Sequence, residues 1–276
     1  MLILLPALMI WMLLNPALTM DAASAACRLF VTSVMPGLFP YMVLALMLVS
    51  RMSARLPPMG LIALGWCGGS PTGARLMRLY PAGSRKTRVR VAVSSATMSP
   101  MFLLGTIGGW LGTPLAGTVV LGSVILGGGL TGALAGRLTP DGAVSENEAK
   151  APPAPLAFGE AVEQTAKTML LVCGTMVMLR VLAALTTASV AYVSLPLTTL
   201  LEVTTGAVQI AELPLPLPLR TAVIAGATGF GGAAVVMQNR ALYPEGLLSL
   251  PEQLLWQVVH GGVSFLLALG AMLLTA

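Results

Sequence analysis

The feature that most constrains this chain is a weak internal repetition of interrupted apolar segments. Residues 70–74 (Ser-Pro-Thr-Gly-Ala) are matched by residues 203–207 (Val-Thr-Thr-Gly-Ala), which places Thr204 133 positions after Pro71 (204 − 71). The other matched pairs are 34–37 with 171–174 and 96–100 with 227–231. Because the three matches keep the same order, they predict a duplicated unit. Duplicated membrane units with interrupted helices are typical of secondary transporters.

The composition places the chain in a membrane. Hydrophobic residues make up 56% of the 276 residues and charged residues only 9%, whereas soluble domains carry about 25% charged residues. The sequence therefore predicts an all-α polytopic membrane protein whose partner is the lipid bilayer. The net charge of +5 then reports orientation in the membrane and indicates no nucleic-acid partner. The three cysteines and the single histidine form no metal-ligand cluster, so neither a metal nor a cofactor is predicted.

Apolar segments of about 20 residues can cross a bilayer. They predict about seven transmembrane helices, over 2–19, 27–50, 91–110, 114–137, 161–188, 219–240 and 254–275. Glycine and proline crowd the centre of segment 59–80, and they interrupt helices. We therefore expect 59–80 and its counterpart 195–213 to be re-entrant hairpins, each entering and leaving on one face of the membrane.

These segments divide the chain into four parts. Residues 1–26 form an N-terminal transmembrane helix or a signal-like segment, because the Ala-rich stretch 22–26 resembles a signal-peptidase site. Residues 27–137 form the first repeat with its hairpin 59–80. The polar segment 138–160 is a linker, and residues 161–276 form the second repeat with its hairpin 195–213.

The basic residues predict an inverted orientation of the two repeats. If the loop 85–90 is cytoplasmic, the predicted spans place ten basic residues inside: Arg51, Arg55, Arg85, Lys86, Arg88, Arg90, Arg137, Lys150, Lys167 and Arg240. Only Arg28 and Arg220 fall outside, as the positive-inside rule favours. The first repeat then begins outside and the second inside. We expect a bacterial cell-membrane protein with a cytoplasmic N-terminus and a cytoplasmic linker.

Helices that are interrupted within a membrane leave backbone groups that need partners, and their free N-termini attract anions. Two matching interruptions favour a substrate site over simple close packing of small residues. The candidate substrate-binding residues are Ser70, Pro71, Thr72, Gly73, Arg75, Ser99, Arg180, Glu202, Thr204, Thr205, Gly206, Gly229, Gly231, Gly232 and Gln238.

Three charged candidates have alternative roles. Arg75 is a counter-charge for an anionic substrate or a side chain that reaches the membrane interface. Arg180 binds substrate or forms an ion pair with Glu202. Glu202 could also take up a proton or help bind Na⁺, either of which would couple transport to an ion gradient. His-Glu-x-x-His, Gly-x-Ser-x-Gly and the phosphate-binding P-loop are all missing from the sequence, which therefore predicts no enzyme.

Several short motifs together resemble a known family. In chain order they are residues 36–41, 69–75, 99–102, 201–206, 229–232 and 259–261. This set is similar to the YlbJ-type sporulation integral membrane proteins, which carry the nucleoside-recognition or Gate domain. The resemblance implies a transporter-like protein of spore-forming bacteria, whose relatives are associated with moving dipicolinic acid, a small aromatic dicarboxylate. Two positions depart from the family pattern: Thr205, where asparagine is usual, and Val236, where histidine is usual.

The sequence as a whole predicts a secondary transporter of a small, dipicolinate-like organic anion that works by alternating access between inverted repeats. Coupling to Na⁺ or H⁺ and assembly into a homo-oligomer both stay open. One alternative is a non-transporting membrane scaffold or assembly factor in spore formation. The other is a nucleoside-type transporter, as the name of the Gate domain suggests.

Overall fold

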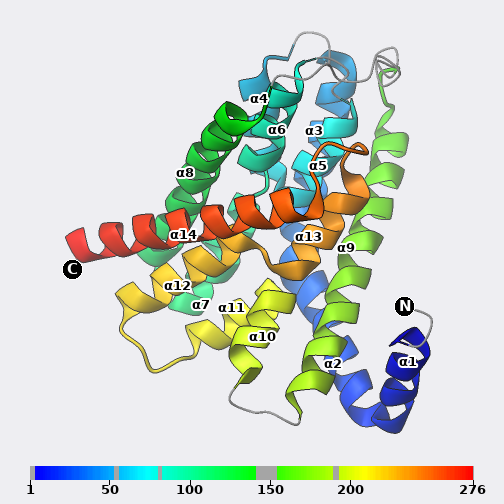
Figure 1. Cartoon of the computed structure of the whole chain (residues 1–276), viewed down its shortest axis with the longest axis vertical. Coiled ribbons are helices and arrows are strands. Elements are labelled where there is room, and N and C mark those ends of the chain that lie inside the picture. The colour runs from blue at the N-terminus through cyan, green and yellow to red at the C-terminus, as the bar shows by residue number, and fades with distance from the viewer. Residues whose placement is uncertain (1–3, 53–55, 80–82, 141–153, 189–192, 276) are drawn as a thin grey trace.

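The computed structural model describes residues 4–52, 56–79, 83–140, 154–188 and 193–275, and every regular element in this part of the chain is a helix (Figure 1). Five helical segments are long and apolar enough to cross a membrane: Pro16–Met52, Pro114–Leu138, Phe158–Thr187, Leu217–Leu242 and Leu250–Leu274. The predicted all-α class is therefore confirmed, and the five segments indicate a membrane protein. The expected total of seven spans stays a prediction.

The part of the first half that the structure describes contains ten helical elements. They are α1 (Leu4–Leu14), α2 (Pro16–Leu29), the π-helical turn η1 (Phe30–Val34), α3 (Met35–Met52), α4 (Pro58–Gly68), α5 (Ser70–Leu79), α6 (Arg85–Ser94), the π-helical turn η2 (Phe102–Ile107), α7 (Gly108–Leu111) and α8 (Pro114–Leu138). The elements α2, η1 and α3 continue one another as a single helix of 37 residues. At 1.5 Å per residue this helix is about 55 Å long, well beyond the roughly 30 Å hydrocarbon core of a bilayer.

The N-terminal segment differs from the expected span 2–19. The helix α1 has only 11 residues, and a new helix begins at Pro16, directly after Asn15. Proline has no backbone N–H and is well suited to a first helical turn, so Pro16 starts α2 and does not extend α1. The hydroxyl of Thr19 and the amide of Asn15 donate to carbonyls of α1, at Met12 and Trp11, and fix the turn.

The described part of the second half contains six helices. Its elements are α9 (Phe158–Thr187), α10 (Ser194–Leu201), α11 (Val203–Ala211), α12 (Leu217–Phe230), α13 (Gly232–Leu242) and α14 (Leu250–Leu274). Within the predicted linker 138–160, residues 141–153 lie outside the described part of the chain. The flanking helices α8 and α9 end and begin at Leu138 and Phe158.

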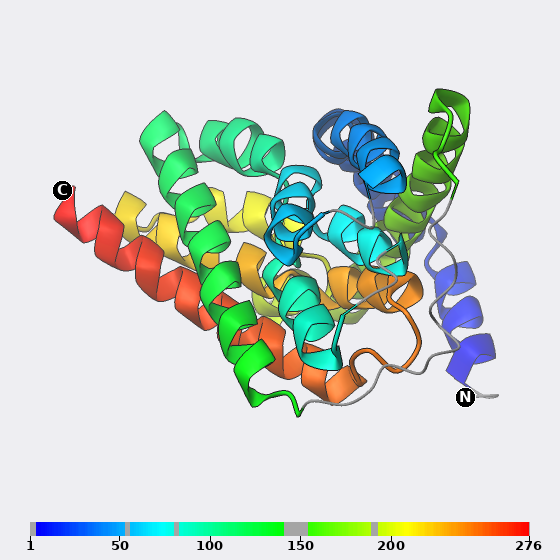
Figure 2. The ribbon, with the colours of Figure 1, turned by 90° about the horizontal axis from the view of Figure 1, so that it is seen from above.

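Short helices occupy the middle of the molecule and long helices surround them. Seen end on, α5 and α13 lie side by side, with α3 and α9 on one side and α8 and α14 on the other (Figure 2). On the outer helices α8 and α14, large apolar side chains such as Leu126, Leu130 and Leu266 are exposed. In a membrane these side chains would face lipid, which explains why apolar residues cover the outside of the fold.

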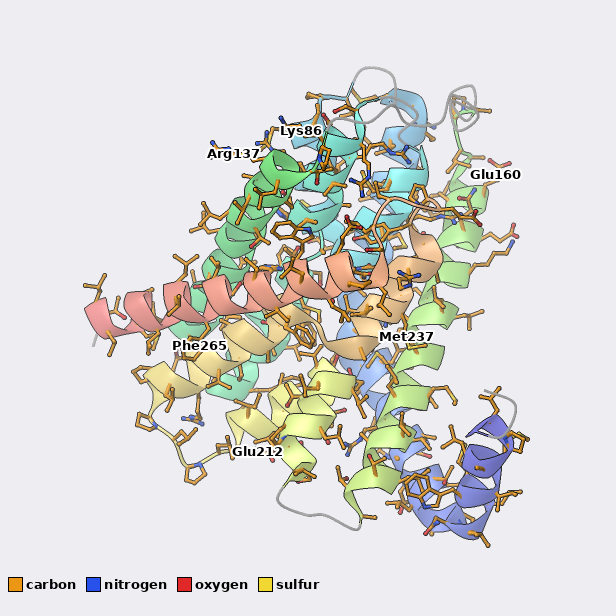
Figure 3. The ribbon with its side chains drawn as sticks, in the orientation of Figure 1. Lys86, Arg137, Glu160, Glu212, Met237 and Phe265 are labelled. Atoms are coloured by element: carbon orange, nitrogen blue, oxygen red, sulfur yellow. The ribbon has the colours of Figure 1, made fainter. Side chains whose placement is uncertain are left out.

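The two hairpins of short helices lie toward opposite ends of the molecule. The pair α4 and α5 lies in the upper half of Figure 1, whereas α10 and α11 lie in the lower half. Lys86 and Arg137 lie at the upper end and Glu212 at the lower end (Figure 3). Arg85 of α6 forms an ion pair with Glu252 of α14 at 3.1 Å, which joins the first turns of two helices.

Candidate functional site

The first hairpin turns at a residue that only glycine tolerates. Gly69, between α4 and α5, has φ +76° and ψ −178°, a region that is essentially closed to residues with a side chain. A Cβ atom at Gly69 would come within 2.9 Å of the backbone nitrogen of Ser99. The tip of the first hairpin therefore contacts Ser99. Residues 95–99 are the non-helical interruption between α6 and η2.

Two side chains satisfy the backbone of this interruption. The indole N–H of Trp66 donates to the carbonyl of Ser94 at 2.7 Å, and the hydroxyl of Ser99 accepts from the N–H of Phe102 at 3.3 Å. Both groups belong to the ends of the interrupted helix, where backbone partners are missing. The interruption is thus held by the protein itself.

The second hairpin meets a second interruption in the same way. The helices α10 and α11 are joined at Glu202, which has an extended backbone (φ −139°, ψ 98°). The helices α12 and α13 are joined at Gly231 and Gly232, with φ values of +81° and +73°. A Cβ atom at Gly232 would lie 3.2 Å from the carbonyl oxygen of Thr199, near the end of α10. Both hairpin tips thus contact an interrupted helix of their own half.

A narrow cavity lies where the two hairpin tips and the two interrupted helices meet. Its volume is about 40 Å³, which is room for a few water molecules. The lining residues predicted from the sequence are Ser70, Pro71, Ser99, Glu202, Thr204 and Gln238. The other lining residues are Val34, Leu38, Met98, Phe102, Val172, Met176, Val203, Ala234 and Val235. We call this space the central cavity.

Two side-chain hydrogen bonds lie at the central cavity, one between the two halves of the chain and one within the second half. The hydroxyl of Ser70, at the start of α5, donates to Oδ1 of Asn239 on α13 at 2.8 Å. Within the second half, Nε2 of Gln238 donates to the hydroxyl of Thr175 on α9 at 2.8 Å. Ser70, Gln238 and Asn239 are all buried, and buried polar groups that lose a partner destabilise a fold. These bonds therefore fix the relative positions of α5, α9 and α13.

Glu202 is the charged group of the central cavity, and it caps helix α11. Its side chain is 1% exposed. Oε1 accepts from the N–H of Thr204 at 2.9 Å, and Oε2 accepts from the N–H and the hydroxyl of Thr205 at 2.7 and 2.6 Å. The expected free N-terminus at this position is therefore occupied by a carboxylate of the chain itself, which the helix dipole also favours.

The ion pair considered for Arg180 and Glu202 does not form within 4.0 Å in the described part of the chain, where the ion pairs are Arg85–Glu252 and Lys167–Glu163. The carboxylate oxygens of Glu202 are directed to the N–H groups of α11, and this capping geometry competes with a guanidinium partner. Arg180 and Thr205 instead line a second, larger cavity beside α2.

Four of the predicted site residues hold helices together. The hydroxyl of Thr72 donates to the carbonyl of Gly68 at 2.8 Å and closes the first hairpin. Gly73 faces Ser95, Gly206 faces Thr199, and Gly229 faces Ser264, each so closely that an added Cβ would come within 3.0 Å of a neighbouring atom. At these positions small residues permit close packing of helices.

Arg75 is not among the residues that line the central cavity. Its Nη2 donates to Oε1 of Gln164 on α9 at 3.0 Å. The contact joins α5 to α9, so Arg75 links the first hairpin to the first long helix of the second half. The expected role as counter-charge for a substrate in the central cavity would require this arginine to move.

The sequence favoured a place at the membrane interface for Asn239, and the apolar wall of the central cavity was not among the candidate residues. Asn239 is 1% exposed and accepts a hydrogen bond from Ser70, although its place beside Gln238 in an apolar span was a usable signal.

One turn further, at the end of α13, the buried phenol of Tyr243 donates to the carbonyl of Ala92 at 3.3 Å. Burial raises the pKa of Tyr243, so the phenol keeps its proton. Among the described residues, no group of three or more His, Cys, Asp or Glu side chains could hold a metal ion.

Comparisons of the chain with protein-family models, with curated proteins and with solved structures find no match.

Proposed function

We propose that this protein is a secondary transporter that carries a small organic anion by alternating access between two inverted repeats. The observation that carries the proposal is the meeting of two hairpin tips and two interrupted helices around one cavity. Interrupted backbone is tolerated at membrane depth only where protein or a water-filled path satisfies it, and transporters place their substrates at such points. A scaffold has no need of two such interruptions.

The order of elements supports a duplicated unit. In the first half, α3 is followed by the hairpin α4–α5, the interrupted helix α6–η2 and the long helix α8. In the second half, α9 is followed by the hairpin α10–α11, the interrupted helix α12–α13 and the long helix α14. The hairpins lie toward opposite ends of the molecule (Figure 1). In an inverted repeat, the two hairpins would enter the membrane from opposite faces, as re-entrant elements.

The size of the central cavity fits a closed state of such a transporter. Ligand pockets generally have volumes of about 300–1,000 Å³, and about 40 Å³ cannot hold an aromatic dicarboxylate. Alternating access requires each hairpin to move away from the cavity in turn. The bond between Ser70 and Asn239 is one that the movement of α5 would break.

A nucleoside-type transporter is the second candidate, and the chemistry of the central cavity favours it. The lining residues include hydroxyls, an amide and the carboxylate of Glu202, but no basic side chain among the described residues. A neutral substrate with several hydrogen-bonding groups suits such a wall, whereas an anion would need to approach Glu202. The resemblance to YlbJ-type proteins is compatible with either substrate.

Thermal unfolding of the purified protein in detergent tests both candidates. Binding to the native state raises the unfolding temperature by mass action. We expect a shift with a small carboxylate from a panel that includes dipicolinate, or with a nucleoside, and the class that acts identifies the substrate. If a folded preparation shifts with no member of either class, the scaffold interpretation replaces the transporter.

A further inference from the structure

A second cavity is lined by residues of α2, η1, α9 and α11, and the helices α2 and α11 lie in the lower half of Figure 1. Its volume is about 490 Å³, within the range of roughly 300–1,000 Å³ that is usual for sites of small organic ligands. Asp21, Arg28, Arg180 and Thr205 contribute polar groups to its wall. Thr205 also donates to Glu202, so the cavity adjoins the hairpin tip that lines the central cavity.

The charges of this second cavity favour an anion. Its wall carries two arginines and one aspartate, which leaves one net positive charge (2 − 1). Arg28 lies in the last turn of α2 and is exposed, whereas Arg180 is half-buried on α9. Both arginines therefore face one space from two different helices, as in the clamps that bind carboxylates.

Arg180 feels the charge of Glu202 but forms no ion pair within 4.0 Å in the described part of the chain. Its Nε atom is buried and makes no hydrogen bond there, and no ion pair joins it to Glu202, whose oxygens bond Thr204 and Thr205. The buried Nε–H of Arg180 has thus lost water without gaining an acceptor, which destabilises the fold. An oxyanion bound in the cavity would supply the missing acceptors in a bidentate arrangement.

We propose that this cavity is a vestibule in which Arg28 and Arg180 hold a small organic carboxylate before it passes Thr205 into the central cavity. The inference rests on the proposed transport function and adds to it a capture step and a substrate class. It also places the positive charge that an anion needs outside the central cavity, where Glu202 opposes an anion. The phosphate of an anionic lipid headgroup has the same oxyanion chemistry, and the test below separates the two sources.

Binding of dipicolinate to the full-length protein in detergent, measured by titration calorimetry, tests the vestibule. We expect Arg28→Gln and Arg180→Gln each to raise the Kd by about tenfold or more, because each removes a charge-assisted hydrogen-bonding group. Arg180→Lys should give an intermediate Kd, since it keeps the charge but loses the planar fork. Arg137→Gln, an exposed arginine at the end of α8, is the matched control and should leave the Kd unchanged.

The result that overturns the vestibule is an equal Kd for wild type, Arg28→Gln and Arg180→Gln, or an absence of binding by dipicolinate, succinate and citrate to the folded wild-type protein. Arg180→Lys keeps the test valid if Arg180→Gln does not fold. Native mass spectrometry with phosphatidylglycerol provides the lipid arm. Lipid retention that Arg28→Gln and Arg180→Gln abolish, and that dipicolinate does not displace, would assign the cavity to lipid and overturn the proposal.

Binding at the vestibule and transport through the central cavity can be tested separately. If wild-type protein in liposomes takes up dipicolinate and both arginine substitutions leave binding and uptake intact, the vestibule is wrong and transport stands. If dipicolinate binds in an arginine-dependent way but no carboxylate or nucleoside enters the liposomes, the vestibule is a binding site and the transport function is wrong.

Discussion

At the scale of single residues, Glu202 shows how a buried charge can serve a helix terminus. The side chain is 1% exposed, and both oxygens accept hydrogen bonds from the first turn of α11. A carboxylate at this position satisfies N–H groups that a helix leaves unpaired and interacts favourably with the helix dipole. The presence of Glu202 at the central cavity therefore has a structural reason, besides the coupling to Na⁺ or H⁺ that the sequence leaves open.

Replacing Glu202 with glutamine should destabilise the protein. Glutamine offers one acceptor oxygen where the carboxylate offers two, and its NH₂ group would face an N–H of α11. We expect a loss of about 1–3 kcal/mol in the free energy of unfolding, measured by thermal unfolding in detergent. Glu212→Gln, at an exposed position after α11, is the matched control. An unchanged stability of Glu202→Gln would contradict the capping role.

Ser70 tests the contact between the two halves. Ser70→Ala removes the 2.8 Å bond to Asn239 and leaves a buried acceptor without its donor. The expected cost is about 1–2 kcal/mol of unfolding free energy. Ser33→Ala is the comparison, because the Ser33 hydroxyl has a long contact of 3.4 Å with the exposed Thr32. Equal stabilities of the two variants would show that the bond to Asn239 contributes nothing.

At the scale of elements, the hairpins depend on glycines that accept positive φ values. Gly69 turns the first hairpin, while Gly231 and Gly232 turn the second interrupted helix. The two halves thus use glycine at different places: at the hairpin tip in the first, and at the interruption in the second. In each case the glycine lies where a hairpin tip touches an interrupted helix.

A side chain at Gly69 should prevent normal folding. Gly69→Ala forces an unfavourable φ and places a Cβ within 2.9 Å of the Ser99 nitrogen, with an expected cost of about 3 kcal/mol or more. Gly122→Ala provides the control, because a Cβ at Gly122 on α8 meets nothing within 4 Å and alanine favours helices by roughly 1 kcal/mol. The yields of monodisperse protein from both variants would check the expectation, which fails if Gly69→Ala behaves like Gly122→Ala.

The sequence was informative about elements and less so about contacts. Pro71 and the neighbouring glycines predicted an interruption within 59–80, and the structure has its turn at Gly69. Hydropathy alone predicted a first helix over 2–19, which was too long. The apolar residues continue through this segment although α1 ends at Leu14 and Pro16 begins a new helix. The place of Arg75 depends on Gln164, 89 positions away, and such long-range pairing leaves no local pattern in a single sequence.

At the scale of the whole molecule, the charge distribution makes a prediction about orientation. Lys86 lies at one end of the fold and Glu212 at the other (Figure 3), and the positive-inside rule assigns the basic end to the cytoplasm. In a variant whose Cys27, Cys67 and Cys173 are replaced by alanine, a membrane-impermeant maleimide should label Glu212→Cys on intact cells. Lys86→Cys should react only after permeabilisation. Labelling of Lys86→Cys on intact cells would reverse the proposed orientation.

Uptake into liposomes that contain the purified protein is the decisive test of transport through the central cavity. We expect wild-type protein to accumulate dipicolinate or a nucleoside. Ala234→Leu should abolish uptake, because the larger side chain fills the central cavity. Ala7→Leu, on the exposed surface of α1, should transport normally. Absence of uptake by folded wild-type protein, or equal uptake by Ala234→Leu and Ala7→Leu, would contradict a transport path through the meeting point of the two hairpins.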